Sequence, residues 1–157
     1  MDVLNREFYL FLKCAQACVL RYMLIGGYAV NYYGYIRNTR DMDVWLAPTN
    51  ENKKAFVETL LCMGYSHSEV DGLHNEDFSG PWVGSIGTAT APIDVLTVVH
   101  HQLSFDEAEK DKQVFEVEPG LSLSFVPYNY LQDMKLRAAR PKDLWDVARL
   151  EELRNKK

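Results

Sequence analysis

The sequence predicts one domain of the α/β (α+β) class, with a short mixed sheet of about five strands and flanking helices. Short apolar runs that stop at glycine or proline alternate with segments of helical periodicity. Strands interleaved with helices in this way build a mixed sheet. The 157 residues suffice for one full hydrophobic core, and the content of 47% hydrophobic and 25% charged residues is ordinary for a globular domain. We therefore expect residues 1–157 to form a single domain.

The first part of the chain is expected to form three helices and two strands. Phe8, Leu12, Ala15 and Val19 recur at helical spacing, and residues 41–47 alternate between apolar and polar side chains. Gly34 and Gly64 are placed to end helices. The expected helices are residues 3–22, 28–33 and 49–63, and the expected strands are residues 22–25 and 41–47.

The remaining chain is expected to contain more strands and two terminal helices. Residues 66–81 are polar and rich in turn signals, so we expect an irregular segment there. Ser104 and Glu107 fit a capping box that opens a short helix. Arg140 and Pro141 divide the last two helices. The expected strands are residues 82–86, 92–99, 113–117 and 121–126, and the final helices are residues 128–139 and 142–155.

Composition and the cysteines limit the classes of protein to consider. No apolar run reaches the ~20 residues of a membrane-spanning helix, and the N-terminus does not read as a secretory signal. The net charge of −5 argues against broad non-specific binding of nucleic acid. Three cysteines without CxxC spacing disfavour a disulfide framework and structural zinc. We expect a cytoplasmic protein without membrane contact, in which Cys14 and Cys18 are buried thiols.

Two carboxylates, Asp41 and Asp43, stand at alternate positions of an expected strand. Residues i and i+2 of a strand face the same side, about 6.6–7 Å apart. A bound cation would relieve the repulsion between two such charges, and an all-oxygen ligand set suits Mg²⁺ or Mn²⁺ better than zinc. The alternative interpretation is a solvated face at the edge of the sheet.

A third carboxylate, Asp94, is the single charge within the apolar run of residues 93–99. Such a run is typical of a central strand, where an unpaired charge is costly. If this strand pairs with the one that carries Asp41 and Asp43, the three carboxylates converge and can hold two metal ions. Asp94 is then also placed to accept the proton of an attacking hydroxyl. The alternative is an aspartate that caps a loop at the end of its strand.

Gly26 and Gly27 allow the backbone to approach a ligand closely, and a helix that begins just after them favours phosphate. Arg37, Thr39 and Arg40 immediately precede the carboxylates. One arginine is placed to face triphosphate oxygens while the other pairs with Asp41 or Asp43. A solvated loop is the alternative for this segment.

Lys135 borders the buried stripe of its expected helix, so its ammonium can reach the edge of the sheet and contact phosphate. Arg137 is expected to pair with Asp133 at i, i+4. Lys142, Asp143 and Asp146 lie in the first turns of the last helix, where carboxylates suit the helix dipole without any catalytic role. Their functional roles stay open at this point.

Three segments resemble the nucleotidyltransferase superfamily. Residues 24–30 and 37–44 match its signature of a hydrophobic residue, Gly-Gly or Gly-Ser, a spacer and Asp-x-Asp. Residues 93–96 resemble the strand that carries the family's third carboxylate. Residues 134–147 are similar to the C-terminal motif of AbiEii-type toxins and related small uncharacterised bacterial proteins.

The resemblance implies a polymerase-beta-like fold that transfers a nucleoside monophosphate from an NTP to a hydroxyl and releases pyrophosphate. It implies two Mg²⁺ ions held by Asp41, Asp43 and Asp94. It also implies that the glycine pair holds the triphosphate and that Lys135 lies near the phosphates. The chain departs from many members in two respects: Gly27 stands where they carry a serine whose hydroxyl contacts phosphate, and there is no room for an additional acceptor-binding helical domain.

The acceptor is open and includes a tRNA end, a protein hydroxyl and a small molecule. A second hypothesis is a toxin–antitoxin component of the same fold that acts by binding a protein or RNA partner with little or no catalysis. Two-metal nucleases also use clustered carboxylates, but the Asp94 strand lacks their ExK pattern. Glycosyltransferases with Asp-x-Asp are longer than this chain.

Overall fold

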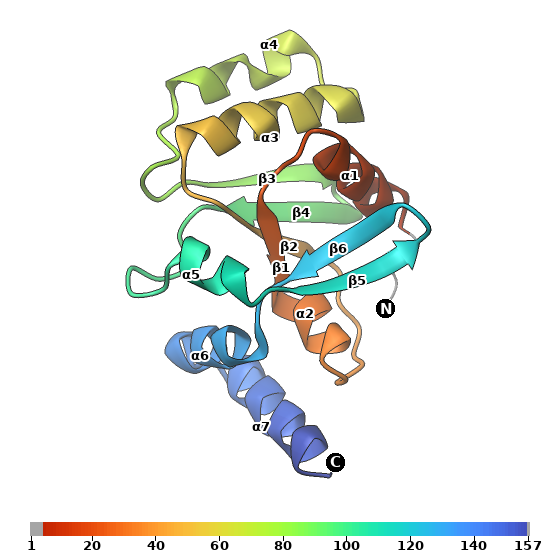
Figure 1. The fold of residues 1–157 in the computed structure, drawn as a ribbon, viewed down its shortest axis with the longest axis vertical. Coiled ribbons are helices and arrows are strands. Elements are labelled where there is room, and N and C mark those ends of the chain that lie inside the picture. The colour runs from red at the N-terminus through yellow and green to blue at the C-terminus, as the bar shows by residue number, and fades with distance from the viewer. Residues whose placement is uncertain (1–4, 157) are drawn as a thin grey trace.

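The computed structural model describes residues 5–156 and contains one six-stranded mixed sheet (Figure 1). The strand order is β3-β4-β2-β1-β6-β5. The strands are β1 (Tyr22–Ile25), β2 (Met42–Leu46), β3 (Val83–Thr88), β4 (Ala91–Leu96), β5 (Gln113–Glu118) and β6 (Leu121–Phe125). The α/β class and the mixed sheet are confirmed, but the expectation of about five strands is one too low.

Helices lie on both sides of this sheet. In Figure 1, α3 and α4 lie above the strands, α1 lies at the right-hand ends of β3 and β4, and α2, α6 and α7 lie below the strands. The helices are α1 (Arg6–Ala17), α2 (Gly26–Tyr32), α3 (Asn50–Met63), α4 (His67–Val70), α5 (Phe105–Lys110), α6 (Tyr128–Ala138) and α7 (Pro141–Asn155), with a 3₁₀ turn η1 (Asp71–Asn75). The hydrophobic core lies between these layers.

The sheet is mixed, with an antiparallel central pair flanked on each side by a parallel pair. β2 runs parallel to β4, and β1 runs parallel to β6. The two edge strands β3 and β5 and the β1–β2 pair are antiparallel. Met42, Val44 and Leu46 are fully buried, which leaves Asp43 on the other face of β2 as the alternation predicts.

Several helix boundaries differ from the expected ones. The helix expected over residues 3–22 ends at Ala17, and its first residues lie outside the described part of the chain. Val19 has a φ of 55°, and the amide of Leu20 donates to the carbonyl of Ala15, which closes the helix end. A β-branched residue in this conformation is uncommon, so the sequence did not predict the stop. α2 begins two residues early, at Gly26.

The segment expected to be irregular, residues 66–81, begins with two short helical turns, α4 and η1. Ser66 and Glu69 form a reciprocal capping box that starts α4. Val70 is buried against the core and fixes this turn in place. The prediction was wrong for residues 67–75 because one buried apolar side chain gives no periodicity to detect.

The expectation that Cys14 and Cys18 are buried thiols is corrected at both positions. Cys14 of α1 and Cys62 of α3 form a disulfide, with their Cα atoms 5.7 Å apart, whereas Cys18 is free and half-buried. Cys14 was expected to be a buried thiol. The two partners lie on adjacent helices and are 48 residues apart in sequence, so no local spacing of cysteines predicts this disulfide.

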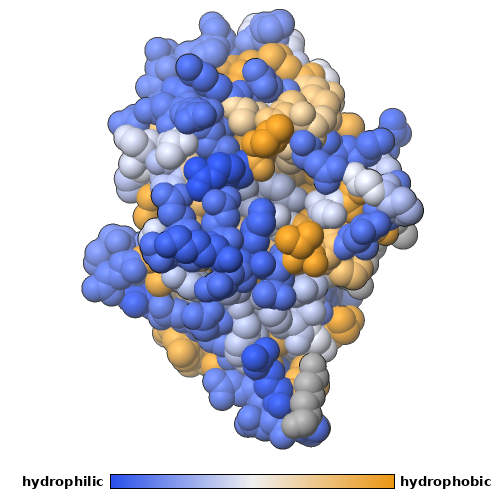
Figure 2. Space-filling model, in the orientation of Figure 1, coloured by the Kyte–Doolittle hydropathy of each residue, from blue (hydrophilic) through white to orange (hydrophobic). Residues whose placement is uncertain are grey.

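The terminal helices are those expected. α6 and α7 are separated at Arg140, and Pro141 occupies the first turn of α7. Nε of Arg137 donates to Oδ1 of Asp133 at 2.9 Å, as the i, i+4 spacing predicts. Within residues 5–156 no helix is long and apolar enough to cross a membrane. Figure 2 shows a mainly hydrophilic face with separate hydrophobic groups.

Candidate active site

Asp43 of β2 and Asp94 of β4 are direct partners in the register of two parallel strands. The alternation in β4 buries Ile93 and Val95 and leaves Asp94 partly exposed on the opposite face. Asp43 also pairs with Ile25, the last residue of β1, across the antiparallel contact. The strand pairing on which the convergence of the carboxylates depends is therefore present, at the point where β1 gives way to α2.

Gly26 lies directly against Asp43. Its φ is +67°, which a side chain would strain, and a Cβ at this position would overlap Oδ2 of Asp43 and lie 3.0 Å from its Cγ. Glycine is required here both by the backbone and by the carboxylate. The contact brings the glycine pair and the Asp-x-Asp motif into one site, although more than a dozen residues separate them in sequence.

The three aspartates line one cleft of about 370 Å³, which we call the carboxylate cleft. Asp41 lies one residue before β2 but faces the same cleft as Asp43 and Asp94. The cleft lies between the sheet and the α6–α7 pair, and its opposite wall carries the basic residues Lys135, Arg140 and Lys142. Carboxylates on one wall thus face cations on the other.

Burial is the largest electrostatic effect on Asp43 in the carboxylate cleft, and the neighbouring carboxylates add to it. Partial burial, with the nearby charges of Asp94 and Asp41, raises the pKa of Asp43 to about 6, although Lys135 and Lys142 act in the opposite direction. None of the three carboxylates forms a hydrogen bond or ion pair with another described residue. Their repulsion is therefore not relieved by protein donors within residues 5–156.

The cleft matches a hard divalent cation in chemistry but is not a closed metal cage. Its three carboxylates are the oxygen ligands that Mg²⁺ and Mn²⁺ prefer, and a cation would relieve the charge that raises the pKa of Asp43. As the side chains stand, no three His, Cys, Asp or Glu residues in the described chain are close enough to hold a metal ion. Side-chain rotation within the cleft would be needed to coordinate one.

A second cavity of about 470 Å³ shares Asp41, Asp43 and Lys142 with the carboxylate cleft. We call it the basic cavity because Arg37 and Arg40 also line it. Gly27 and Thr39 complete its polar wall. The two spaces therefore share the Asp41–Asp43 pair, and cations line both of them.

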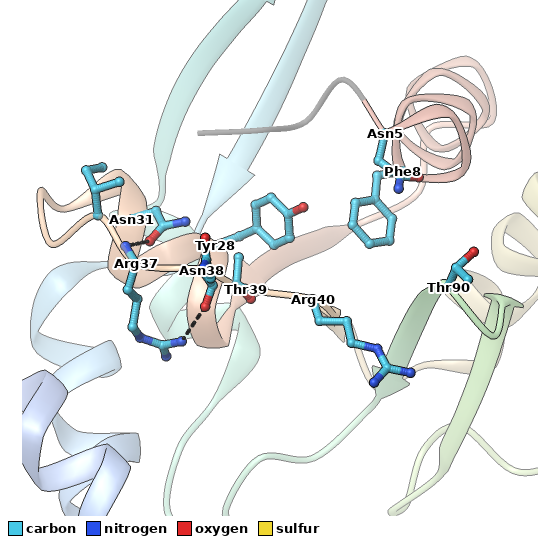
Figure 3. Close-up of a pocket in the computed structure, with 10 residues that line it drawn as sticks. Asn5, Phe8, Tyr28, Asn31, Arg37, Asn38, Thr39, Arg40 and Thr90 are labelled. Atoms are coloured by element: carbon cyan, nitrogen blue, oxygen red, sulfur yellow. Dashed lines mark hydrogen bonds between the residues drawn. The ribbon is translucent and has the colours of Figure 1, made fainter.

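The basic cavity adjoins a third one of about 650 Å³, drawn in Figure 3, and residues 37–40 line both. Figure 3 shows Arg37 and Arg40 extending from this segment in different directions. The Nη2 atom of Arg40 donates to the carbonyl of Ala89 in the β3–β4 turn at 3.1 Å. The amide of Arg37 donates to Oδ1 of Asn31 at 3.1 Å. Neither arginine pairs with Asp41 or Asp43, as one of them was expected to do.

A buried ion-pair network holds the wall formed by α6 and α7. Nζ of Lys135 lies 3.0 Å from Oδ2 of Asp146 and 3.5 Å from Oδ1 of Asp143. Asp146 also accepts two hydrogen bonds from Arg37, from Nε at 3.0 Å and from Nη2 at 2.9 Å. Asp146 thus joins cations from both cavities.

Asp143 and Arg140 extend this network to the surface. Nε of Arg140 donates to Oδ2 of Asp143 at 2.6 Å, and the same carboxylate accepts from the Arg140 amide at the start of α7. Burial raises the pKa of Asp143, but the hydrogen bonds from Arg140 and the charge of Lys135 outweigh it and hold that pKa below its ordinary value. Helix capping explains Asp143 as expected.

The expectation that Asp146 serves the helix dipole was wrong, because this side chain is fully buried and forms ion pairs with cations. A signal was present in the sequence. Asp143, Asp146 and Leu150 have the i, i+3, i+7 spacing of one buried helix face, so two carboxylates on that stripe required buried cations as partners. Lys135 lines the cleft as expected, with two of its three donors directed to carboxylates.

No family model matches this chain, and no curated protein matches it. The function proposed below therefore depends on the geometry of the site and on the resemblance of its motifs.

Proposed function

We propose that this protein is a metal-dependent nucleotidyltransferase that moves a nucleoside monophosphate from an NTP to a hydroxyl acceptor. The observation that supports this most is the direct register pairing of Asp43 with Asp94, next to Asp41, in a cleft whose far wall is basic. Carboxylates face cations there, and a metal–triphosphate complex would need groups of both kinds. The motif resemblance points to the same reaction.

The carboxylate cleft suits the metal side of this reaction. Asp41, Asp43 and Asp94 would hold Mg²⁺, which supplies charge neutralisation for the triphosphate and for the attacking and leaving oxygens. Asp94 would also accept the proton of the acceptor hydroxyl. The hydroxyl oxygen forms a bond to the α-phosphorus, the bond between that phosphorus and the β-bridging oxygen breaks, and pyrophosphate leaves with the electron pair.

The cations flanking the aspartate pair suit the phosphate side. Lys142 is exposed and forms no ion pair with another described residue, so its charge is available to a phosphate oxygen. Arg40 and the remaining donor of Lys135 can supply further contacts. Because Arg37 already donates two hydrogen bonds to Asp146, its side chain stays in place. We propose that its positive charge attracts the phosphates without a direct hydrogen bond to them.

Calorimetric titration with each NTP, with and without Mg²⁺, tests the proposal. The wild type is expected to bind at least one NTP only when Mg²⁺ is present, and Asp43→Ala to lose that binding without losing its fold. Asp106→Asn, which removes an exposed carboxylate outside the cleft, is the matched control and should bind normally. If the wild type binds no NTP in the presence of either Mg²⁺ or Mn²⁺, the proposed function fails.

A further inference from the structure

Gly27 is a glycine because of the space around it rather than its backbone conformation. It is buried in the first turn of α2 and has no positive φ. A Cβ at this position would overlap Oγ1 of Thr39 and lie 2.7 Å from its Cβ, with Nη1 of Arg37 at 3.5 Å. Thr39 therefore fills the volume that a side chain of residue 27 would occupy.

Thr39 is one of the residues that line the basic cavity. The cavity is lined by Arg37, Arg40 and Lys142, and it reaches Asp41 and Asp43. The hydroxyl donates to the carbonyl of Asp41 at 3.3 Å, which is long for a hydroxyl donor. A ligand with a better acceptor, such as a phosphate oxygen, can therefore redirect it at little cost.

Residues 37–40, the segment that carries Thr39, are held in place by hydrogen bonds on both sides of Thr39. Arg37 is held by the two hydrogen bonds to Asp146 of α7, and its amide by Asn31 of α2. Arg40 is held by the carbonyl of Ala89. The position of the Thr39 hydroxyl is thus set by contacts of residues 37–40 with three separate parts of the fold.

We propose that the hydroxyl of Thr39 donates a hydrogen bond to a phosphate oxygen of the bound NTP. Residue 27 is glycine because the Thr39 side chain occupies the volume that a Cβ there would need. This inference rests on the proposed function, because the phosphate is that of the metal–nucleotide substrate. Position 27 and position 39 then form one unit, in which a hydroxyl can come from either residue but not from both.

The test measures Mg²⁺-dependent affinity for α,β-methylene NTP analogues, which bind without being consumed, in wild type and variants. Thr39→Val replaces the hydroxyl with a methyl group of similar size and is expected to weaken binding about tenfold, with thermal unfolding unchanged. Thr39→Ser is the matched variant that keeps the hydroxyl and should restore most of the affinity. Gly27→Ala should weaken binding although Thr39 is intact, because the added methyl group displaces it.

The most specific variant moves the hydroxyl from residue 39 to residue 27. The double variant Gly27→Ser/Thr39→Ala frees the volume at residue 39 and supplies a hydroxyl from residue 27, so it should bind more tightly than Thr39→Ala alone. If the wild type binds the analogues and Thr39→Val binds equally well, this inference is overturned while the proposed function stands. If the wild type binds none of them, the proposed function fails and the inference fails with it.

Discussion

The guanidinium of Arg37 and the carboxylate of Asp146 form a two-point contact, with Nε–Oδ1 and Nη2–Oδ2 distances of 3.0 and 2.9 Å. The two residues are 109 positions apart in sequence. Asp146 is fully buried and also forms an ion pair with the ammonium of Lys135. Through this carboxylate α7 is attached to the segment that precedes Asp41 and Asp43.

Removing the charge of Asp146 is expected to be strongly destabilising. Asp146→Asn leaves the buried ammonium of Lys135 and the Arg37 guanidinium without their shared anion, so unfolding free energy should fall by about 3–5 kcal/mol. Urea denaturation of the wild type and the variant measures this difference in unfolding free energy. Glu152→Gln weakens exposed pairs with Arg149 and Lys156 and is the control, with an expected loss below about 1 kcal/mol. Equal small losses in both variants would contradict the role given to Asp146.

The contact between Gly26 and Asp43 predicts the effect of a single methyl group. Gly26→Ala adds strain at a positive φ, which costs about 1–2 kcal/mol, and also collides with the Asp43 carboxylate. Gly64→Ala is the matched control, because Gly64 also has a positive φ but nothing lies within 4 Å of its added Cβ. Denaturation should show the greater loss for Gly26→Ala. Equal losses would mean that Asp43 moves away freely.

The raised pKa of Asp43 predicts a pH-dependent effect of neutralising it. Because the pKa is about 6 in the folded protein against an ordinary 3.8, the folded state binds the proton more tightly, and stability falls as the pH rises between these values. In metal-free buffer Asp43→Asn should therefore be more stable than the wild type above pH about 6, by at most about 3 kcal/mol. The difference should vanish below pH about 4. A variant less stable than wild type at neutral pH contradicts this account.

The disulfide between Cys14 and Cys62 predicts a redox-dependent stability. Closing a chain segment of 48 residues should stabilise the oxidised protein by about 2–4 kcal/mol. Denaturation with and without a reductant measures this difference. Thiol titration of the denatured, oxidised protein should find one reactive cysteine, Cys18, and Cys18→Ser should leave the stability difference intact. Three reactive thiols before reduction would show that the bond does not form.

The sequence predicted the parts of the site that depend on local periodicity. Alternation along β2 and the apolar run around Asp94 placed both carboxylates on strands, and the structure pairs them. Pairing of Asp146 with Arg37 depends on how α7 lies against the segment before β2, which no local pattern encodes. The place of Thr39 against Gly27 was equally hidden, because a missing Cβ does not reveal which side chain occupies its volume.

The most direct test of the proposed function follows the label of the transferred phosphate. Purified protein is incubated with Mg²⁺, total cell extract and each NTP, labelled at either the α- or the γ-phosphate. The account predicts that α-label becomes attached to an acceptor, that γ-label appears only in pyrophosphate, and that Asp94→Asn abolishes both. Transfer of γ-label to an acceptor, or no transfer of α-label from any NTP with either Mg²⁺ or Mn²⁺, would contradict it.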